Sequence, residues 1–274
     1  MASERFIDVA GLRTRVLGEG SGHPTLLLHG ASLGSSSDVW SGNLDALAAR
    51  GLRVIAPDLP GFGETTNSAD HSVGFRTRFV LQLLDALGID RAHVVGHSQS
   101  GQIAVKLAIE HPERIGKIVV LGTASLLPPL PDSGAGDAAE GDDGNMEEPT
   151  PIEVRRQLAE TVFNQTRITA DAVAIRHRMS IGKNFDAFLA RRAGKSGGKK
   201  ATDSKPLWQR LDEVKVPMRF IYGRQDRAAE RRATLARQRY PGLDLHLIDR
   251  CRHLVQWDTP TEFAALTADF LTAG

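Results

Sequence analysis

A turn of small residues with a serine at its apex, GHSQSG at residues 96–101, is the stretch of this chain best suited to chemistry. An apolar run precedes the turn, and the apolar spacing of residues 103–109 predicts a helix after it. A strand, a tight turn and a helix form a nucleophile elbow, in which strained backbone holds the serine hydroxyl clear of the sheet. We therefore predict Ser98 as a nucleophile. The alternative is a Gly/Ser-rich turn that only connects a strand to a helix.

A serine hydroxyl becomes a good nucleophile when a base removes its proton, and a third group must hold that base in the correct tautomer. Among nine histidines, His253 is best placed as the base, because it lies in a predicted loop between the last strand and the last helix. His246 lies inside a strand pattern and His111 at a helix end, so both are expected to be structural. His97 cannot reach the serine hydroxyl from the correct side, so we assign it to the pocket wall.

Asp226 is the predicted orienting acid, since it closely follows a buried apolar strand. The chain order of serine, aspartate and histidine also fits a triad on a sheet of this kind. Asp249 and Asp258 remain alternatives for the same role.

The backbone amides of Gln99 and Ala31 are predicted to form an oxyanion hole. Gln99 directly follows the nucleophile, at the start of a helix whose N-terminal amides attract negative charge. Ala31 lies in a loop at residues 29–32, which follows the apolar run at residues 25–28. A loop at the carboxyl end of a buried strand is where open α/β sheets bind ligands.

Segments that alternate between strand and helix character must position these residues. Strands are expected at residues 6–9, 14–17, 25–28, 54–57, 117–121, 218–223 and 244–248, and helices at 44–49, 79–87, 103–109, 230–239 and 261–271. The first two strands are joined by a short turn and should form an antiparallel edge. The alternation of the others predicts an α/β fold with a mostly parallel, doubly wound sheet.

The alternation breaks between residues 125 and 206, where helical character is confined to residues 152–163 and 170–179. Residues 132–148 carry seven acids and no base, which predicts a flexible acidic loop. Residues 191–200 are basic and rich in glycine; a solvated loop is favoured over nucleic-acid binding, because no aromatic residue is interleaved. We expect a helical cap at 125–206, inserted into a core formed by residues 1–124 and 207–274.

The composition limits the partners of this 274-residue chain. A net charge of +1 favours neither nucleic acid nor an anionic membrane, so a small neutral or anionic ligand is expected. One cysteine, Cys251, excludes an internal disulfide and suits the cytoplasm. We find no signal peptide and no apolar run long enough to span a membrane. No clustered ligands indicate a metal or another cofactor, and a homo-oligomer stays possible.

Five stretches together resemble the α/β-hydrolase superfamily: HG at 29–30, DLPGFG at 58–63, GHSQSG at 96–101, GRQD at 223–226 and CRHLVQW at 251–257. The last is similar to the histidine loop of the meta-cleavage product hydrolases, which usually reads CGHWAQW. Those enzymes cut a carbon–carbon bond in the products of catechol ring fission. The stretch ITAD at 168–171, followed by Arg176, is similar to the family segment whose arginine binds the dienoate end of the substrate.

This resemblance implies a mechanism and a set of substrate contacts. Arg176 and the loop that contains Gly30 and Ser32 would hold the acid head while the dienol is converted to its ketone. Ser98 would then attack the distal carbonyl, and water would release the acid. His97, Leu254 and Trp257 would also line the substrate pocket.

Several positions depart from the family pattern. The loop after the first buried strand runs ASLGSSSDVW at residues 31–40 and has no asparagine at the matching place, while Ala228 and Ala229 replace the usual Val-Pro. His97 replaces an asparagine, and Leu254 replaces a bulky tryptophan. A wide apolar wall of Leu254, Met179 and Phe163 would therefore favour a substrate with an aryl tail.

Two other functions stay open. A carboxylesterase or enol-lactonase would use the same triad without needing Arg176, which would then be a surface arginine paired with a nearby acid. A non-catalytic ligand receptor can also retain the triad on this fold.

Overall fold

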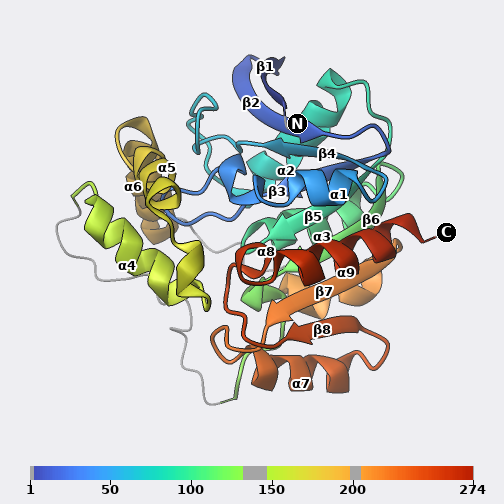
Figure 1. The fold of residues 1–274 in the computed structure, drawn as a ribbon. Helices are drawn as coiled ribbons and strands as arrows, with labels where there is room; N and C mark the ends of the chain where they lie inside the picture. The colour runs from blue at the N-terminus through green and yellow to red at the C-terminus, as the bar shows by residue number, and fades with distance from the viewer. Residues whose placement is uncertain (1–2, 132–146, 198–204, 274) are drawn as a thin grey trace.

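The computed structural model describes residues 3–131, 147–197 and 205–273 (Figure 1). Within these residues, eight strands form one sheet in the order β1-β2-β4-β3-β5-β6-β7-β8. The strands are β1 Ser3–Val9, β2 Leu12–Glu19, β3 His23–Leu28, β4 Leu52–Pro57, β5 Ala92–His97, β6 Ile115–Leu121, β7 Met218–Gly223 and β8 Asp244–Ile248. β2 pairs antiparallel with both β1 and β4, and the other pairs are parallel. The predicted mostly parallel α/β sheet is confirmed.

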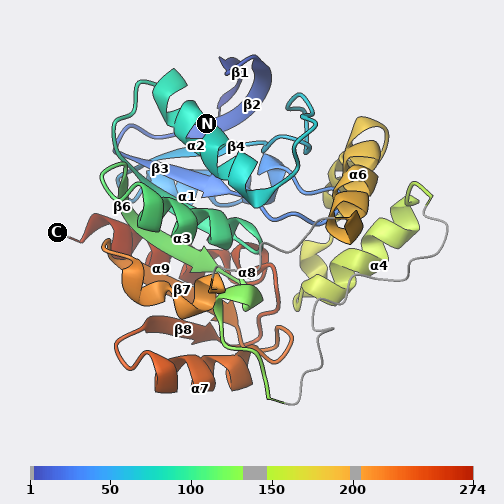
Figure 2. The same cartoon turned by 180° about the vertical axis from the view of Figure 1, so that it is seen from behind.

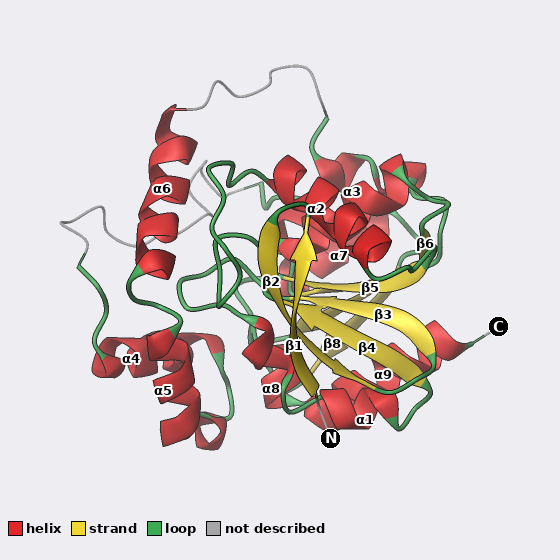
Figure 3. Ribbon diagram, turned by 90° about the horizontal axis from the view of Figure 1, so that it is seen from above, coloured by secondary structure: helices red, strands yellow, loops and turns green. Residues whose placement is uncertain are grey.

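Helices cover both faces of this sheet. The α-helices are α1 Leu44–Ala48, α2 Val73–Ala86, α3 Ser100–Glu110, α4 Pro151–Thr161, α5 Ala170–Arg178, α6 Lys183–Gly197, α7 Ala229–Arg239, α8 Val255–Asp258 and α9 Pro260–Thr272. Short 3-10 helices lie at Ser37–Trp40, Ala124–Leu126, Gln165–Arg167, Leu207–Gln209 and Leu211–Glu213. Helices α2, α3 and α7 cover one face, and α1, α8 and α9 cover the other (Figure 3). Central strands are therefore buried on both sides, and every residue of β5 is buried.

Helices α4, α5 and α6 lie together to one side of the sheet (Figures 1 and 2). Helix α4 begins at a capping box, in which Thr150 and Glu153 satisfy each other's backbone amides, and Pro151 occupies its first turn. The helices expected at residues 152–163 and 170–179 correspond to α4 and α5. No strand occurs in the part of 125–206 that the structure describes.

The prediction of a solvated basic loop at residues 191–200 is wrong for its first part, because α6 continues to Gly197. The buried side chains of α6 are spaced like one helical face: Asn184, Phe185, Ala187 and Arg191. Burial of this face outweighs the weak helix propensity of the glycines. Residues 198–200, and residues 132–146 of the predicted acidic loop, lie outside the described residues.

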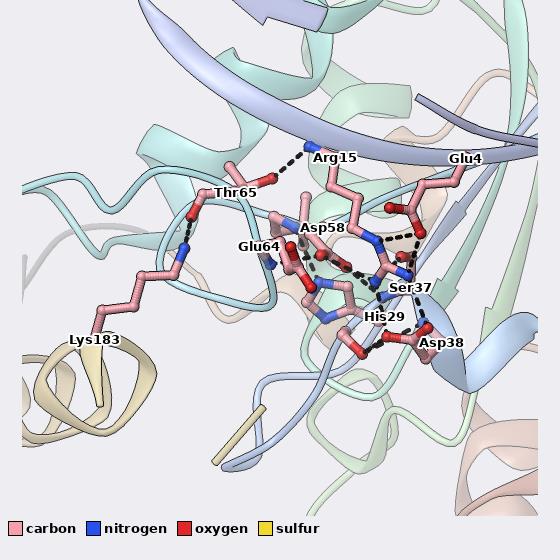
Figure 4. A network of polar contacts seen from close by, with 11 residues as sticks. Glu4, Arg15, His29, Ser37, Asp38, Asp58, Glu64, Thr65 and Lys183 are labelled. Carbon is pink, nitrogen blue, oxygen red and sulfur yellow. Dashed lines mark hydrogen bonds and ion pairs between the residues drawn. The ribbon is translucent and has the colours of Figure 1, made fainter. Parts of the chain in front are cut away.

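The carboxylate of Asp58, which directly follows β4, is fully buried and joins two strand-end loops (Figure 4). It accepts hydrogen bonds from Ser37 N at 2.6 Å and Glu64 N at 2.8 Å. Arg15 of β2 lies 3.5 Å from it and also pairs with Asp38 and Glu4. Glycine is required at position 63 for two reasons. A Cβ there would lie 2.0 Å from the Asp58 carboxylate, and the φ of Gly63 is +53°, in the left-handed region.

His29 connects the same two loops. Its Nε2 accepts a hydrogen bond from Leu59 N at 3.0 Å, and its Nδ1 donates to Gly30 O at 2.7 Å. Burial lowers the pKa of His29 to about 4, so the ring is neutral near pH 7 and holds this tautomer. The loop that contains Gly30 and Ala31 is therefore fixed before any ligand binds.

We predict that Asp58→Asn lowers the free energy of unfolding by about 3 kcal/mol, because it leaves the buried Arg15 charge without its buried partner. Glu4→Gln is the matched control: Glu4 contacts the same guanidinium, but its side chain is 49% exposed, so the loss should stay below about 1 kcal/mol. Urea unfolding of both variants gives the comparison. Equal small losses would contradict a structural role for the Asp58 carboxylate.

Candidate active site

Ser98 occupies the tight turn between β5 and α3. Its φ is +54°, in the left-handed region that a residue with a side chain rarely adopts. Ser98 N donates a hydrogen bond to Leu121 O at 2.7 Å, and Thr123 Oγ1 donates to Ser98 O at 2.6 Å. These contacts hold the strained backbone in place, and strain of this kind is typical of functional sites.

Two glycines allow the helix to approach the strand. A Cβ at Gly96 would lie 2.3 Å from Ser100 O, and a Cβ at Gly101 would lie 2.1 Å from Thr123 Oγ1. Both distances are far below van der Waals contact, so a larger residue at either position would push α3 away from the sheet. The elbow geometry expected from the sequence is present.

Asp226 and His253 are brought together from β7 and β8 by the loops that follow these strands. His253 Nδ1 lies 2.9 Å from Asp226 Oδ2, and Asp226 is buried. When Nδ1 donates its proton to this carboxylate, the lone pair of Nε2 is left free to act as a base. This is the arrangement that a serine nucleophile needs.

The two alternative acids have other partners. Asp249 is exposed and forms an ion pair with Arg224. Asp258 is buried and accepts hydrogen bonds from the backbone amides of Arg252, Phe163 and Asn164. It therefore ties the histidine loop to the end of α4. The geometry favours Asp226 as the orienting acid.

Gly30 brings the oxyanion loop against the elbow. A Cβ at Gly30 would lie 3.1 Å from both Ser98 Cβ and His97 Nδ1, so the backbone of Gly30 packs against the elbow. Ala31 is the next residue along this loop. In the described part of the chain, no hydrogen bond joins the Ser98 hydroxyl to His253. Such bonds are often long in unliganded enzymes and tighten when substrate binds. Ala31 and Gln99 stay predictions for the oxyanion hole.

His97 contacts the loop that carries His253. Its Nε2 lies 3.1 Å from His253 O, and the two rings are 4.9 Å apart. Burial, and then the charge of His253, hold the pKa of His97 well below its usual value. His97 is therefore neutral, with Nε2 as the donor to the carbonyl.

Arg176 of α5 reaches the same loop from the cap. Its Nη2 donates a hydrogen bond to Ser32 Oγ at 2.9 Å. Among the described residues, no carboxylate lies within ion-pair distance of it, and burial lowers its pKa to about 10. An arginine held this way at a pocket, without an acid partner, is suited to bind an anion.

Arg176 and Trp257 both line a pocket of about 350 Å³ between the loop at residues 34–42, α5 and α8. Trp257 Nε1 donates to Val39 O at 2.8 Å, which fixes its ring. Ser98, Asp226 and His253 do not line this pocket. The charge of Arg176 nevertheless acts on His97, the residue before Ser98.

The predicted apolar wall is not assembled as expected. Phe163 lines a separate pocket with Asp249 and Asp258. Leu254 and Met179 are buried, and Leu254 N donates to Thr161 O at 3.1 Å. Leu254 thus connects the histidine loop to the cap, and the exposed Phe163 ring lies on another surface because Asp258 holds its backbone there.

Sequence reasoning missed two arginines near the elbow. Arg76 of α2 donates to Gln99 Oε1 at 2.6 Å, and Arg191 of α6 donates to Gly61 O at 2.8 Å. Arg76 lies just before the helix predicted at residues 79–87, and Arg191 lies in the stretch predicted to be a solvated basic loop. The spacing of Asn184, Ala187 and Arg191 along one face of a helix was the available signal for the second.

The sequence model of the alpha/beta hydrolase fold family matches residues 24–166. The chain belongs to this family. The 2-hydroxy-6-oxononadienedioate/2-hydroxy-6-oxononatrienedioate hydrolase of Paraburkholderia phymatum is 31% identical, covering 98% of this chain and 96% of the relative. The 2-hydroxy-6-oxo-6-phenylhexa-2,4-dienoate hydrolase of Burkholderia cepacia is 32% identical, covering 97% of this chain and 93% of the relative. Within the α/β hydrolases, the chain is thus one of the meta-cleavage product hydrolases.

A solved structure shows the same fold. The 2-hydroxy-6-oxo-6-phenylhexa-2,4-dienoate hydrolase of Rhodococcus sp. strain RHA1 matches with a TM-score of 0.81 at 22% identity, covering 100% of this chain and 99% of that chain. In the described parts of this α/β hydrolase, no helix is both long and apolar enough to cross a membrane.

We predict that His97→Asn flattens the dependence of stability on pH. The unfolded histidine takes up a proton below about pH 6.5, whereas folded His97 stays neutral, so the wild type loses stability as pH falls. Removing this histidine should reduce the slope by about 1 kcal/mol per pH unit between about pH 6 and pH 5. Urea unfolding at several pH values measures it. Parallel curves for wild type and variant would contradict the neutral, buried state of His97.

Proposed function

We propose that this hydrolase cleaves the carbon–carbon bond of a 2-hydroxy-6-oxohexa-2,4-dienoate formed by ring fission during degradation of aromatic compounds. Ser98, His253 and Asp226 form the triad. The observation that carries the proposal is the Arg176 guanidinium, which lacks an acid partner among the described residues and is joined to the oxyanion loop through Ser32. A plain esterase has no use for such a cation.

In the proposed reaction, Arg176 and Ser32 hold the carboxylate head of the substrate, and Gly30 leaves room for it beside the nucleophile. The bound dienol is first converted to its ketone, because the leaving carbon is then stabilised as an enolate. His253 removes the Ser98 proton, and the serine oxygen attacks the distal carbonyl.

The attack places negative charge on the former carbonyl oxygen, which the backbone amides of Gln99 and Ala31 stabilise. The carbon–carbon bond then breaks, and His253 returns its proton to the dienoate fragment. Water, activated by the same histidine, hydrolyses the acyl-serine and releases the second acid. Each step is carried out by side chains of the chain itself, so we propose no metal or organic cofactor.

Esterase or enol-lactonase activity is the second candidate, because the Asp226–His253 pair would serve ester cleavage equally well. A non-catalytic receptor is a third, since the fold alone does not require turnover. We also propose a cytoplasmic location, with no nucleic-acid or membrane partner, and leave a homo-oligomer possible.

The names of the relatives agree on the dienoate head and differ in the tail. The Paraburkholderia phymatum enzyme is named for a dienedioate, and the Burkholderia cepacia enzyme for a phenyl-bearing dienoate. The head chemistry is therefore the part of the proposal that they support. The aryl tail expected from Leu254 depended on an apolar wall that the structure does not assemble, so we do not extend the proposal to an aryl tail.

Ser98→Ala should reduce kcat/KM on the dienoate by at least about a thousandfold, because the attacking oxygen is removed. Binding and folding should persist, since the change removes one hydroxyl. Ser125→Ala, an exposed serine, is the matched control and should retain full activity. Retention of a tenth or more of the wild-type rate would exclude Ser98 as the nucleophile.

Arg176→Ala should depress kcat/KM on the dienoate by about a hundredfold, because it removes a charge-assisted bond, and should change aryl-ester hydrolysis little. Arg178→Ala, an exposed arginine on the same helix, is the control. Equal losses on both substrates would indicate a folding role for Arg176. Unchanged activity on both would favour the esterase.

A further inference from the structure

Arg76 and Arg191 form a second buried cationic cluster next to the elbow. Arg76 comes from α2 and is 3% exposed; Arg191 comes from α6 of the cap and is 9% exposed. Both guanidinium groups lie against the Phe62 ring, at 5.6 Å and 4.0 Å from its centroid. The cap and the sheet domain thus each contribute one positive charge to the same small volume.

The hydrogen-bond partners of this cluster are neutral. Arg76 Nη2 donates to Gln99 Oε1 at 2.6 Å and to His71 O at 3.2 Å, and Arg191 Nη1 donates to Gly61 O at 2.8 Å. Arg76 Nε is buried without a partner, and so is His71 Nδ1. A Cβ at Gly61 would lie 3.1 Å from Arg191 Nη1 and 3.3 Å from His71 Nδ1, so these groups converge on one place.

No carboxylate among the described residues lies within ion-pair distance of either guanidinium. Asp70 is the acid whose charge acts on Arg76, and it pairs with Arg78 at 3.6 Å. Burial lowers the pKa of Arg76 to about 10, and burial together with the charge of Arg76 lowers the pKa of Arg191 to about 10. Two like charges withdrawn from water with only neutral partners are costly unless an anion joins them.

Arg15 shows how this protein treats a buried arginine that has only a structural role. It is 4% exposed, about as buried as Arg76, yet it contacts Glu4, Asp38 and Asp58 (Figure 4). Those carboxylates balance its charge, and its pKa is raised. The contrast indicates that the Arg76–Arg191 cluster is built for an anion that arrives from outside.

The cluster lies next to the reacting groups. Arg76 is bonded to the side chain of Gln99, the neighbour of Ser98, whereas Arg176 reaches the elbow through Ser32 and Gly30. The two cationic sites therefore approach the nucleophile through different loops.

We propose that Arg76, Arg191 and His71 form a second anion subsite, which binds a carboxylate on the tail of the substrate, so that the preferred substrate is a dicarboxylate. This inference rests on the proposed function. Hydrolysis turns the tail carbonyl into a carboxylic acid, while the dienoate carbon takes the proton. A tail that already carries a carboxylate therefore leaves as a dicarboxylic acid; a 2-carboxyethyl tail leaves as succinate.

The test compares kcat/KM for three ring-fission substrates with the same head and a 2-carboxyethyl, propyl or phenyl tail. The wild type should prefer the 2-carboxyethyl tail to the propyl tail by at least about tenfold, the effect of one charge-assisted bond. Equal values for these two tails, or a clear preference for phenyl, would overturn the subsite. If no dienoate is consumed, the proposed function itself fails.

Variants localise the preference. Arg76→Gln and Arg191→Gln should each lower the ratio of the 2-carboxyethyl to the propyl value to about threefold or less, and the ratio cancels any loss common to both substrates. Arg191→Lys keeps the charge and should retain part of the preference. Arg78→Gln is the matched control on α2, since its side chain is 66% exposed, and should leave the ratio unchanged. An unchanged ratio in both glutamine variants would overturn the assignment.

A measurement on the wild type needs no variant to fold. Succinate and butyrate, the acids left by the 2-carboxyethyl and propyl tails, are compared as inhibitors of propyl-tail turnover at fixed ionic strength. Succinate should have an inhibition constant at least about tenfold lower. Equal inhibition constants would mean that groups of the chain itself already balance the charge of Arg76 and Arg191, and they would overturn the proposal.

Discussion

The buried carboxylate of Asp58 is the interaction on which the active-site scaffold depends. It holds the loop after β3 through Ser37 N and the loop after β4 through Glu64 N, while Arg15 balances its charge. His29 adds a second connection between these loops. Parallel strands bring their carboxyl ends to one edge of the sheet, but the loops that follow them lack the regular hydrogen bonds that join the strands. A buried, fully bonded carboxylate supplies that missing order and so positions the oxyanion loop beside Ser98.

His253, the proposed base, is held by contacts from the sheet and from helix α4 together. Asp226 orients its ring and His97 binds its carbonyl, both from the sheet domain. The flanking Leu254 and Arg252 bond to Thr161 O and Ala159 O at the end of α4. The Asp258 carboxylate accepts hydrogen bonds from Phe163 N, just after α4, and from Arg252 N in the histidine loop. The cap therefore does more than cover the pocket, because a shift of α4 would displace the histidine loop.

Charge balance separates Arg15 from the arginines that we propose to bind anions. Arg15 is surrounded by acids, whereas Arg176 and Arg76 have neutral hydrogen-bond partners in the described chain. Desolvation without a counter-ion raises the free energy of the unliganded state, and binding an anion recovers it. In the proposed reaction Arg176 holds the dienoate head, and this chain carries a further pair of buried cations, Arg76 and Arg191.

The sequence by itself determined the order and type of most elements, because apolar periodicity reports burial directly and the elbow needs small residues at set positions. It also indicated Asp226 and His253, since each follows a strand whose end must lie at the ligand-binding edge. Only the tertiary structure decided which distant groups meet. The buried face of α6 and the separation of Phe163 from Leu254 depend on how helices α4–α6 pack on the sheet. The contact of Arg76 with Gln99 depends on how α2 packs against α3. Such contacts join residues far apart in the chain, and local patterns carry no information about them.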